Sequence, residues 1–162
     1  MTEEEFIERF GGIYEHSQWV AEEVAAEAHV CEDLADVATL MAECVDNASA
    51  DRQLTLIRAH PDLAGKAQIA GELTADSTDE QASAGLDQCS AKEYAQFQDL
   101  NDRYKDKFGF PFVMAVRASS RADILAAFSA RLENNAATEF ETALQEIHKI
   151  AQLRLQAMGT ES

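Results

Sequence analysis

Residues 56–86 read LIRAHPDLAGKAQIAGELTADSTDEQASAGL, and this stretch determines how the rest of the chain is interpreted. A helical pattern ends at His60-Pro61, because proline disfavours α geometry in the residue that precedes it. A loop containing Gly, Asp and Thr follows, in which residues 66–69 are expected to form a short helical turn. A second helix is predicted over 77–86. Two helix ends that face one loop can place an imidazole and a carboxylate together.

Most of the remaining chain shows apolar residues at helical spacing, three and four apart. With only two Pro and seven Gly in 162 residues, helices are favoured over a β architecture. Ser17, Ser49 or Asp51, Ser90, and Ser119 or Ser120 are the expected N-caps. The helices are predicted over residues 1–10, 17–29, 32–47, 49–60, 77–86, 90–108, 120–132 and 136–155.

The sequence FGFPFVMAV at 108–116 does not fit a helix. Gly109 and Pro111 interrupt the pattern, and the five apolar residues from Phe112 to Val116 indicate a buried extended segment. Buried backbone groups need hydrogen-bond partners, and a bound polar ligand is one source of them. The prediction is therefore an all-α fold, a single compact bundle of about seven to nine helices with one short extended buried segment near 108–116. One domain is expected over 1–162.

The net charge of −17 is distributed unevenly, with fourteen acidic residues and one arginine in residues 1–51. Such a field repels phosphate backbones, so nucleic-acid binding is not expected. No apolar run is long enough to span a membrane, the acidic MTEEEF start is unlike a signal peptide, and TES is not a peroxisomal address. Three scattered cysteines do not form a disulfide framework. A cytoplasmic protein with reduced thiols is expected.

Three charged residues are candidates for chemistry, and each has a structural alternative. His60 could transfer protons near neutral pH, or could complement the dipole at a helix carboxyl end. Glu80 could act as an acid or base, or could close a capping box with Ser77. Arg154 continues the core-facing stripe of the last helix, so it either pairs with an anion or extends along the surface to solvent. Arg117 is a weaker candidate for anion binding.

Metal and cofactor sites are not predicted. The chain has no H-x-x-x-H or H-x-x-E-H spacing, and Asp62 lies too close to His60 to define a metal site. It also has no glycine-rich phosphate loop and no G-x-S-x-G sequence.

Four pieces of the chain, in this order, resemble the family of 2-oxo-4-hydroxy-4-carboxy-5-ureidoimidazoline (OHCU) decarboxylases of the urate-to-allantoin pathway. They are HPDLAG at 60–65, Ser77-x-x-Glu80-Gln81 followed by AGL at 84–86, FGFPFV at 108–113, and LRL at 153–155. Each piece alone is weak, whereas the ordered set is specific and spans about two-thirds of the chain.

The resemblance implies an all-helical fold and a cofactor-independent carboxy-lyase that produces S-allantoin and CO2. It implies that His60, Glu80 and Arg154 are catalytic. The substrate-binding positions that it implies are Pro61, Ser77, Gln81, Phe112, Val113, Met114 and Ala115. It further implies functional coupling to urate oxidase and hydroxyisourate hydrolase, and a homodimer is expected because relatives of this kind are often dimeric.

Two other classes of function remain open from the sequence. His60-Pro61-Asp62 also occurs in J-domain co-chaperones, but the basic helix expected upstream is absent, since residues 32–58 hold six acidic residues and two arginines. A non-catalytic acidic helical interaction module is the other alternative. Binding to a chaperone ATPase, or turnover of a ureidoimidazoline, would separate them.

Overall fold

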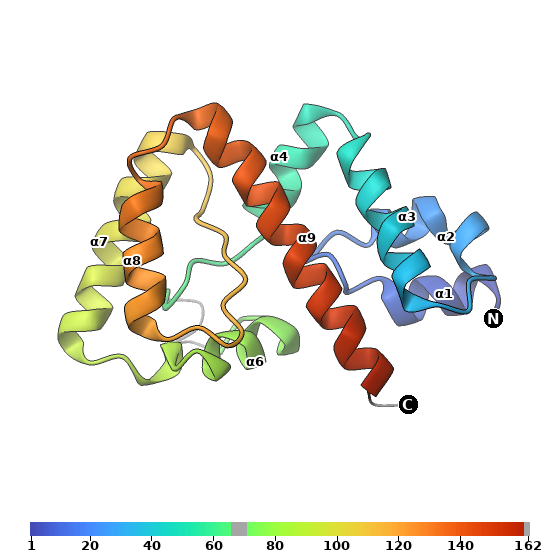
Figure 1. Cartoon of the computed structure of the whole chain (residues 1–162), viewed down its shortest axis with the longest axis horizontal. Helices are drawn as coiled ribbons and strands as arrows, with labels where there is room; N and C mark the ends of the chain where they lie inside the picture. The colour runs from blue at the N-terminus through green and yellow to red at the C-terminus, as the bar shows by residue number, and fades with distance from the viewer. Residues whose placement is uncertain (66–70, 161–162) are drawn as a thin grey trace. The chain divides into compact units, whose positions relative to one another are not determined.

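The structure of the protein is a computed structural model that describes residues 1–65 and 71–160. Within these residues it contains eight α-helices, one 3-10 helix and no strand (Figure 1). The helices are α1 (Glu3–Phe10), α2 (Trp19–Ala28), α3 (Leu34–Asp46), α4 (Ala50–Arg58), α6 (Ala75–Ser83), η1 (Leu86–Gln88), α7 (Ala91–Phe108), α8 (Arg121–Arg131) and α9 (Ala136–Thr160). The all-α prediction is confirmed, and the turn predicted over 66–69 lies outside the described residues. No helix of the described chain is long and apolar enough to cross a membrane.

Residue contacts divide the chain into two compact units. The N-terminal unit comprises Met1–Ala59 together with Ile147–Ser162, and the central unit comprises His60–Glu146. Helix α9 contributes to both, because the boundary falls between two of its residues. The expectation of a single domain over 1–162 stays a prediction.

In the N-terminal unit, α2 packs against both α1 and α3. Its helix starts differently from the prediction, because Gln18 occupies the N-cap position without a side-chain hydrogen bond. The Ser17 hydroxyl instead donates to the Glu15 carbonyl at 2.9 Å, so the predicted Ser17 cap is wrong. The predicted Ser49 cap of α4 is confirmed. Helix α4 ends at Arg58, two residues before His60. This agrees with the rule that proline, here Pro61, disfavours α geometry in the residue before it.

In the central unit, the core is an aromatic cluster between α7, α8 and the segment that links them. The rings of Phe112 and Phe128 stack with their centroids 3.9 Å apart, and Tyr104 meets both of them edge-on. The linking segment is not helical, and Phe110, Phe112, Val113 and Val116 are buried while Met114 and Ala115 are half-buried. The predicted extended segment near 108–116 is therefore confirmed.

Helix α6 begins earlier than predicted. Its first residue is Ala75, and its N-cap is Thr74, whose hydroxyl accepts from the Ser77 amide at 3.2 Å. The capping box predicted between Ser77 and Glu80 is therefore wrong, because both residues lie inside the helix rather than at its end. Glu80 loses the structural explanation that the spacing offered.

The capping box predicted at the start of α7 is confirmed. The Ser90 hydroxyl accepts from the Glu93 amide at 3.1 Å, and the Ser90 amide donates to the Glu93 carboxylate at 3.0 Å. That amide and the Arg121 guanidinium hold the pKa of Glu93 below its ordinary value of 4.5. Stabilisation from these bonds is consequently present above that pH and is lost as the pH falls through the lowered pKa of the folded state.

Ser90→Ala is expected to lower the free energy of unfolding by about 1 kcal/mol, because one amide of the first turn of α7 loses its acceptor. Urea denaturation would measure the change. Ser129→Ala, at an exposed position inside α8, is the matched control and should shift stability by less than about 0.5 kcal/mol. Equal losses in the two variants would contradict the capping role.

Candidate active site

Helix α6 buries a polar face. Ser77, Glu80 and Gln81 lie three and four residues apart, and they are its buried residues. Glu80 is 9% exposed and Gln81 2% exposed. Short amphipathic helices normally bury apolar side chains, since burying polar groups costs free energy unless they are hydrogen-bonded. A helix that buries a carboxyl, an amide and a hydroxyl together is typical of a functional site.

Gln81 joins this face of α6 to the loop that follows His60. Its side-chain oxygen accepts from the Ala64 amide at 3.0 Å, and its side-chain nitrogen donates to the Asp62 carbonyl at 3.2 Å. His60, two residues before Asp62, is itself only 8% exposed. The structure therefore brings the first two predicted motifs together through the side chain of Gln81. The side-chain amide of Gln81, which was predicted to recognise the substrate, therefore also holds the loop after His60.

Helix α7 holds the same loop with a polar stripe. Gln98 donates to the Ala64 carbonyl at 2.9 Å, Asn101 donates to the Leu63 carbonyl at 3.0 Å, and Lys105 contacts the Asp62 carboxylate at 2.7 Å. The three side chains are spaced by three and four residues, so they lie on one side of the helix. None of the three was identified from the sequence.

A buried ion pair holds the backbone of residues 112–115, the predicted substrate-binding segment, in place. Arg131 donates to the Val113 carbonyl at 2.6 Å and contacts the Glu139 carboxylate at 2.8 Å. Tyr104 donates to Glu139 at 2.5 Å, and burial together with this bond raises the pKa of its phenol. The backbone amide of Ala115 donates to the Glu146 carboxylate at 3.3 Å. The polar partners that the sequence required for this segment thus include side chains of the chain itself.

Arg154 is 6% exposed, so the structure excludes extension to solvent and leaves pairing with an anion, the other alternative for its place on the core-facing stripe. Its guanidinium contacts the carboxylate of Glu15, which is 2% exposed, at 2.9 Å. It also donates to the carbonyls of Gly12 and Ile13 at 3.4 and 3.3 Å. These groups all belong to the N-terminal unit. Arg117, the weaker candidate, is exposed.

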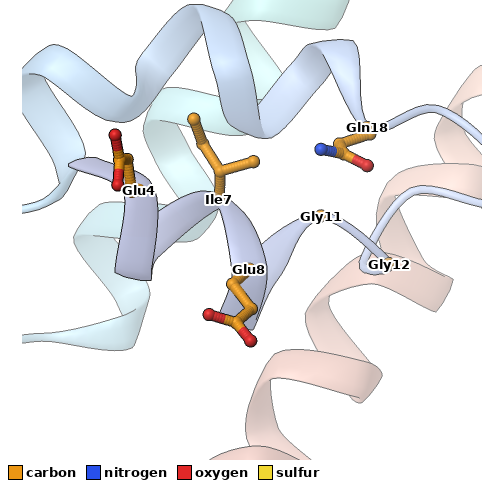
Figure 2. Close-up of a pocket in the computed structure, with 6 residues that line it drawn as sticks. All are labelled: Glu4, Ile7, Glu8, Gly11, Gly12 and Gln18. Carbon is orange, nitrogen blue, oxygen red and sulfur yellow. The ribbon is translucent and has the colours of Figure 1, made fainter. Parts of the chain in front are cut away.

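A surface hollow of about 600 Å³ lies beside α1 in the same unit. One side of α1, the two glycines after it and Gln18 form its lining, and Figure 2 shows these residues. None of the predicted site residues lines this hollow, and its two glutamates, Glu4 and Glu8, make it unsuited to an anion.

The sequence profile of the OHCU decarboxylase family matches residues 1–156. The chain belongs to the OHCU decarboxylase family. The resemblance drawn from the four ordered motifs is thereby confirmed, and a J-domain is no longer a candidate.

Two relatives illustrate the range of the OHCU decarboxylase family. The 2-oxo-4-hydroxy-4-carboxy-5-ureidoimidazoline decarboxylase of Haloferax volcanii is 44% identical over 155 residues, which cover 96% of this chain and 89% of that protein. A uric acid degradation bifunctional protein of Bacillus sp. (strain TB-90) is 43% identical over 99% of this chain, but only 31% of its own length is covered.

Solved structures support the OHCU decarboxylase fold. The crystal structure of an (S)-allantoin synthase matches with a TM-score of 0.77 and 33% identity, covering 97% of this chain and 50% of that chain. An OHCU decarboxylase crystallised in the presence of (S)-allantoin matches with a TM-score of 0.67 over 84% of this chain and 89% of its own. At 24% identity, the second structure supports the fold alone.

Among the charged groups of this OHCU decarboxylase family member, Glu15 is the clearest example of one that the sequence did not identify. A buried arginine requires an anion, so the sequence indicated that Arg154 needs a partner. Fourteen acidic residues in positions 1–51 offered too many choices, and Glu15 lies outside any helical pattern. It is also 139 residues away from Arg154 in the sequence.

Glu15→Gln is expected to lower the free energy of unfolding by about 2 kcal/mol, because it removes the charge of a buried partner of Arg154. Thermal or urea unfolding would measure this. Glu22→Gln, an exposed glutamate of α2, makes the same chemical change and should leave stability nearly unaltered. If the two variants unfolded alike, the ion pair would not stabilise the N-terminal unit.

Proposed function

We propose that this protein decarboxylates 2-oxo-4-hydroxy-4-carboxy-5-ureidoimidazoline to S-allantoin and CO2 in urate catabolism. The observation that carries the proposal is membership of the OHCU decarboxylase family over residues 1–156, with 44% identity to a decarboxylase across 96% of the chain. The buried polar face of α6, fastened to the loop after His60, supplies the kind of environment in which acid–base groups work.

The reaction can proceed without a cofactor, because the substrate contains its own electron acceptor. One ring carbon carries a hydroxyl and a carboxylate, beside a C=N carbon that carries the ureido group. As the bond to the carboxylate breaks, its electron pair moves towards the C=N group and CO2 leaves. The hydroxyl loses its proton as it becomes a carbonyl, while the nitrogen of the former C=N group and the ureido-bearing carbon each gain one. Overall, one proton is consumed for each CO2 released from the substrate anion.

His60 and Glu80 are the proposed proton-handling pair. Both are buried in the central unit, and their neighbours Asp62 and Gln81 are hydrogen-bonded to each other. An imidazole and a carboxyl in a water-poor environment can share the removal of the hydroxyl proton and the delivery of the carbon-bound proton. Delivery to one face of the planar intermediate would give the S enantiomer.

The other predicted residues are proposed to hold the substrate. Arg154 would bind an anionic or polar part of the substrate through its guanidinium group. Ser77 and Gln81 would orient the ureide and the ring, and Gln81 retains one amide hydrogen for this. Pro61 and the backbone of residues 112–115 would complete the contacts.

The test is circular dichroism at a wavelength that reports chiral allantoin. The unstable substrate would be generated from urate in the cuvette by urate oxidase and hydroxyisourate hydrolase. We expect rapid appearance of S-allantoin only when the protein is present. A circular dichroism trace identical to that of spontaneous decay, which gives racemic product, would refute the proposal. It would favour the alternative, a non-catalytic interaction module.

The proposal includes a cellular setting. Enzymes that make so unstable a substrate must act nearby, so we place the protein in the cytoplasm with urate oxidase and hydroxyisourate hydrolase activities. Its three cysteines are free thiols, which suits a reducing compartment. A homodimer is proposed, and light scattering of the purified protein would test it.

A further inference from the structure

The loop that follows His60 is held by side-chain amides at consecutive backbone positions. The carbonyls of Asp62, Leu63 and Ala64 accept hydrogen bonds from Gln81, Asn101 and Gln98, respectively. Two different helices, α6 and α7, supply these donors. The conformation of the loop is therefore imposed from outside by groups that are far away in the sequence.

The loop needs this external support. Ala64 has φ of +51°, in the left-handed region that a residue with a Cβ rarely adopts. Such a conformation is strained and persists only where surrounding contacts enforce it. At Ala64, both the amide and the carbonyl are bound by side chains, those of Gln81 and Gln98.

Asn101 is the most informative of the donors. It is fully buried, and its side-chain nitrogen donates to the Leu63 carbonyl, whereas its side-chain oxygen has no hydrogen-bond partner within the described structure. An unsatisfied buried oxygen is unfavourable for stability, and such groups call for an explanation. The explanation offered by the geometry is that this position requires a donor directed at Leu63, at some cost to stability.

We propose that Asn101 and Gln98 are positioning residues of the decarboxylation, acting through the 62–64 backbone on the imidazole of His60. This inference rests on the proposed function. His60 connects to the held loop through Pro61, whose ring fixes one backbone dihedral, so a shift of residues 62–64 is transmitted to His60 over a short and stiff connection. Displacement of a catalytic group by about 1 Å can cost about 100-fold in rate.

The decisive variant is Asn101→Leu, which keeps the volume and removes the donor. It also removes the unsatisfied oxygen while leaving the Leu63 carbonyl without its donor, so one unsatisfied group replaces another. We therefore expect little change in melting temperature. kcat is expected to fall by about 10- to 100-fold, with kcat/KM falling by the same factor, because transition-state stabilisation rather than substrate binding is lost.

Gln98→Met gives an independent measurement, since Gln98 is only half-buried and the change is mild for folding. Its matched control is Gln96→Met, at an exposed position of the same helix that faces away from the loop. Gln98→Met should lower kcat, and Gln96→Met should leave kcat and KM unchanged. Equal kcat in these two folded variants would overturn the assignment of Gln98.

A double-mutant cycle separates action through His60 from a general structural effect. In the His60→Ala background, Asn101→Leu should cause no further loss of rate, because the group that it positions is already absent. Additive losses would overturn the inference. The proposed function fails separately, since it would be refuted by an inactive wild type. An active wild type, an impaired His60→Ala and an unimpaired Asn101→Leu would reject the positioning role alone.

Discussion

His60→Ala is expected to lower kcat for S-allantoin formation by about 10²- to 10⁴-fold, the range over which a positioned acid–base group contributes to catalysis. The imidazole lies in a buried position next to the loop that α6 and α7 hold, so bulk water is a poor substitute for it. The circular dichroism assay with substrate generated from urate would give the rate. Glu80→Gln, which keeps shape and removes the acid–base function, should produce a loss of the same order.

The matched control is His29→Ala. His29 is the C-cap of α2 and binds the Ala25 carbonyl through Nδ1 at 2.8 Å, so it represents a histidine with a purely helical role. This variant should retain the wild-type kcat. Wild-type turnover by a folded His60→Ala or Glu80→Gln protein would remove that residue from the proposed proton-handling pair.

Glu139→Ala is expected to lower the free energy of unfolding by about 3–5 kcal/mol, because it leaves a buried guanidinium without its counter-charge. The Glu139 carboxylate is fully buried and accepts hydrogen bonds from Tyr104, Arg131 and Asn134. Arg131 would keep the Val113 carbonyl as an acceptor but lose its anion. Urea denaturation monitored by far-ultraviolet circular dichroism would measure the loss.

Tyr104 provides a second readout of the same substitution. Burial raises the pKa of its phenol, and the hydrogen bond to Glu139 raises it further. In Glu139→Ala, the pKa of Tyr104 should therefore move down while remaining above its ordinary value, as measured by ultraviolet absorbance titration. Glu141→Ala, an exposed position two residues along α9, should change neither property. Unaltered stability of Glu139→Ala would show that the ion pair does not support the central unit.

The helices were predictable because their signals are local. The spacing of apolar residues indicated that the helices exist. N-cap serines indicated where α4, α7 and α8 begin, at Ser49, Ser90 and Ser120. The start of α6 could not be predicted from the sequence, because Thr74 and Ser77 lie three residues apart and both are favourable N-cap residues. The rule that favours Ser77 depends on Glu80 being free to turn back to the helix end. Burial of Glu80 is a tertiary effect that the local pattern does not contain.

The candidate site was predictable only in part, for a related reason. His60, Glu80 and Gln81 lie in short motifs that can be compared directly with a family. Gln98 and Asn101 contact the loop from 34 and 38 residues away, and their partners are backbone carbonyls, which carry no sequence signal.

The chemistry of the donors that hold the 62–64 loop also governs its response to ionic strength. Dissolved salt screens interactions between exposed charges, such as Arg103 with Asp99 at 3.4 Å, and has little effect on hydrogen bonds between neutral buried groups. Amides carry no net charge and do not titrate at physiological pH. Concentrated salt therefore weakens the ion pairs on the outside of this acidic chain, including that of Lys105 with Asp62, while the neutral amide hydrogen bonds to the carbonyls of residues 62–64 persist.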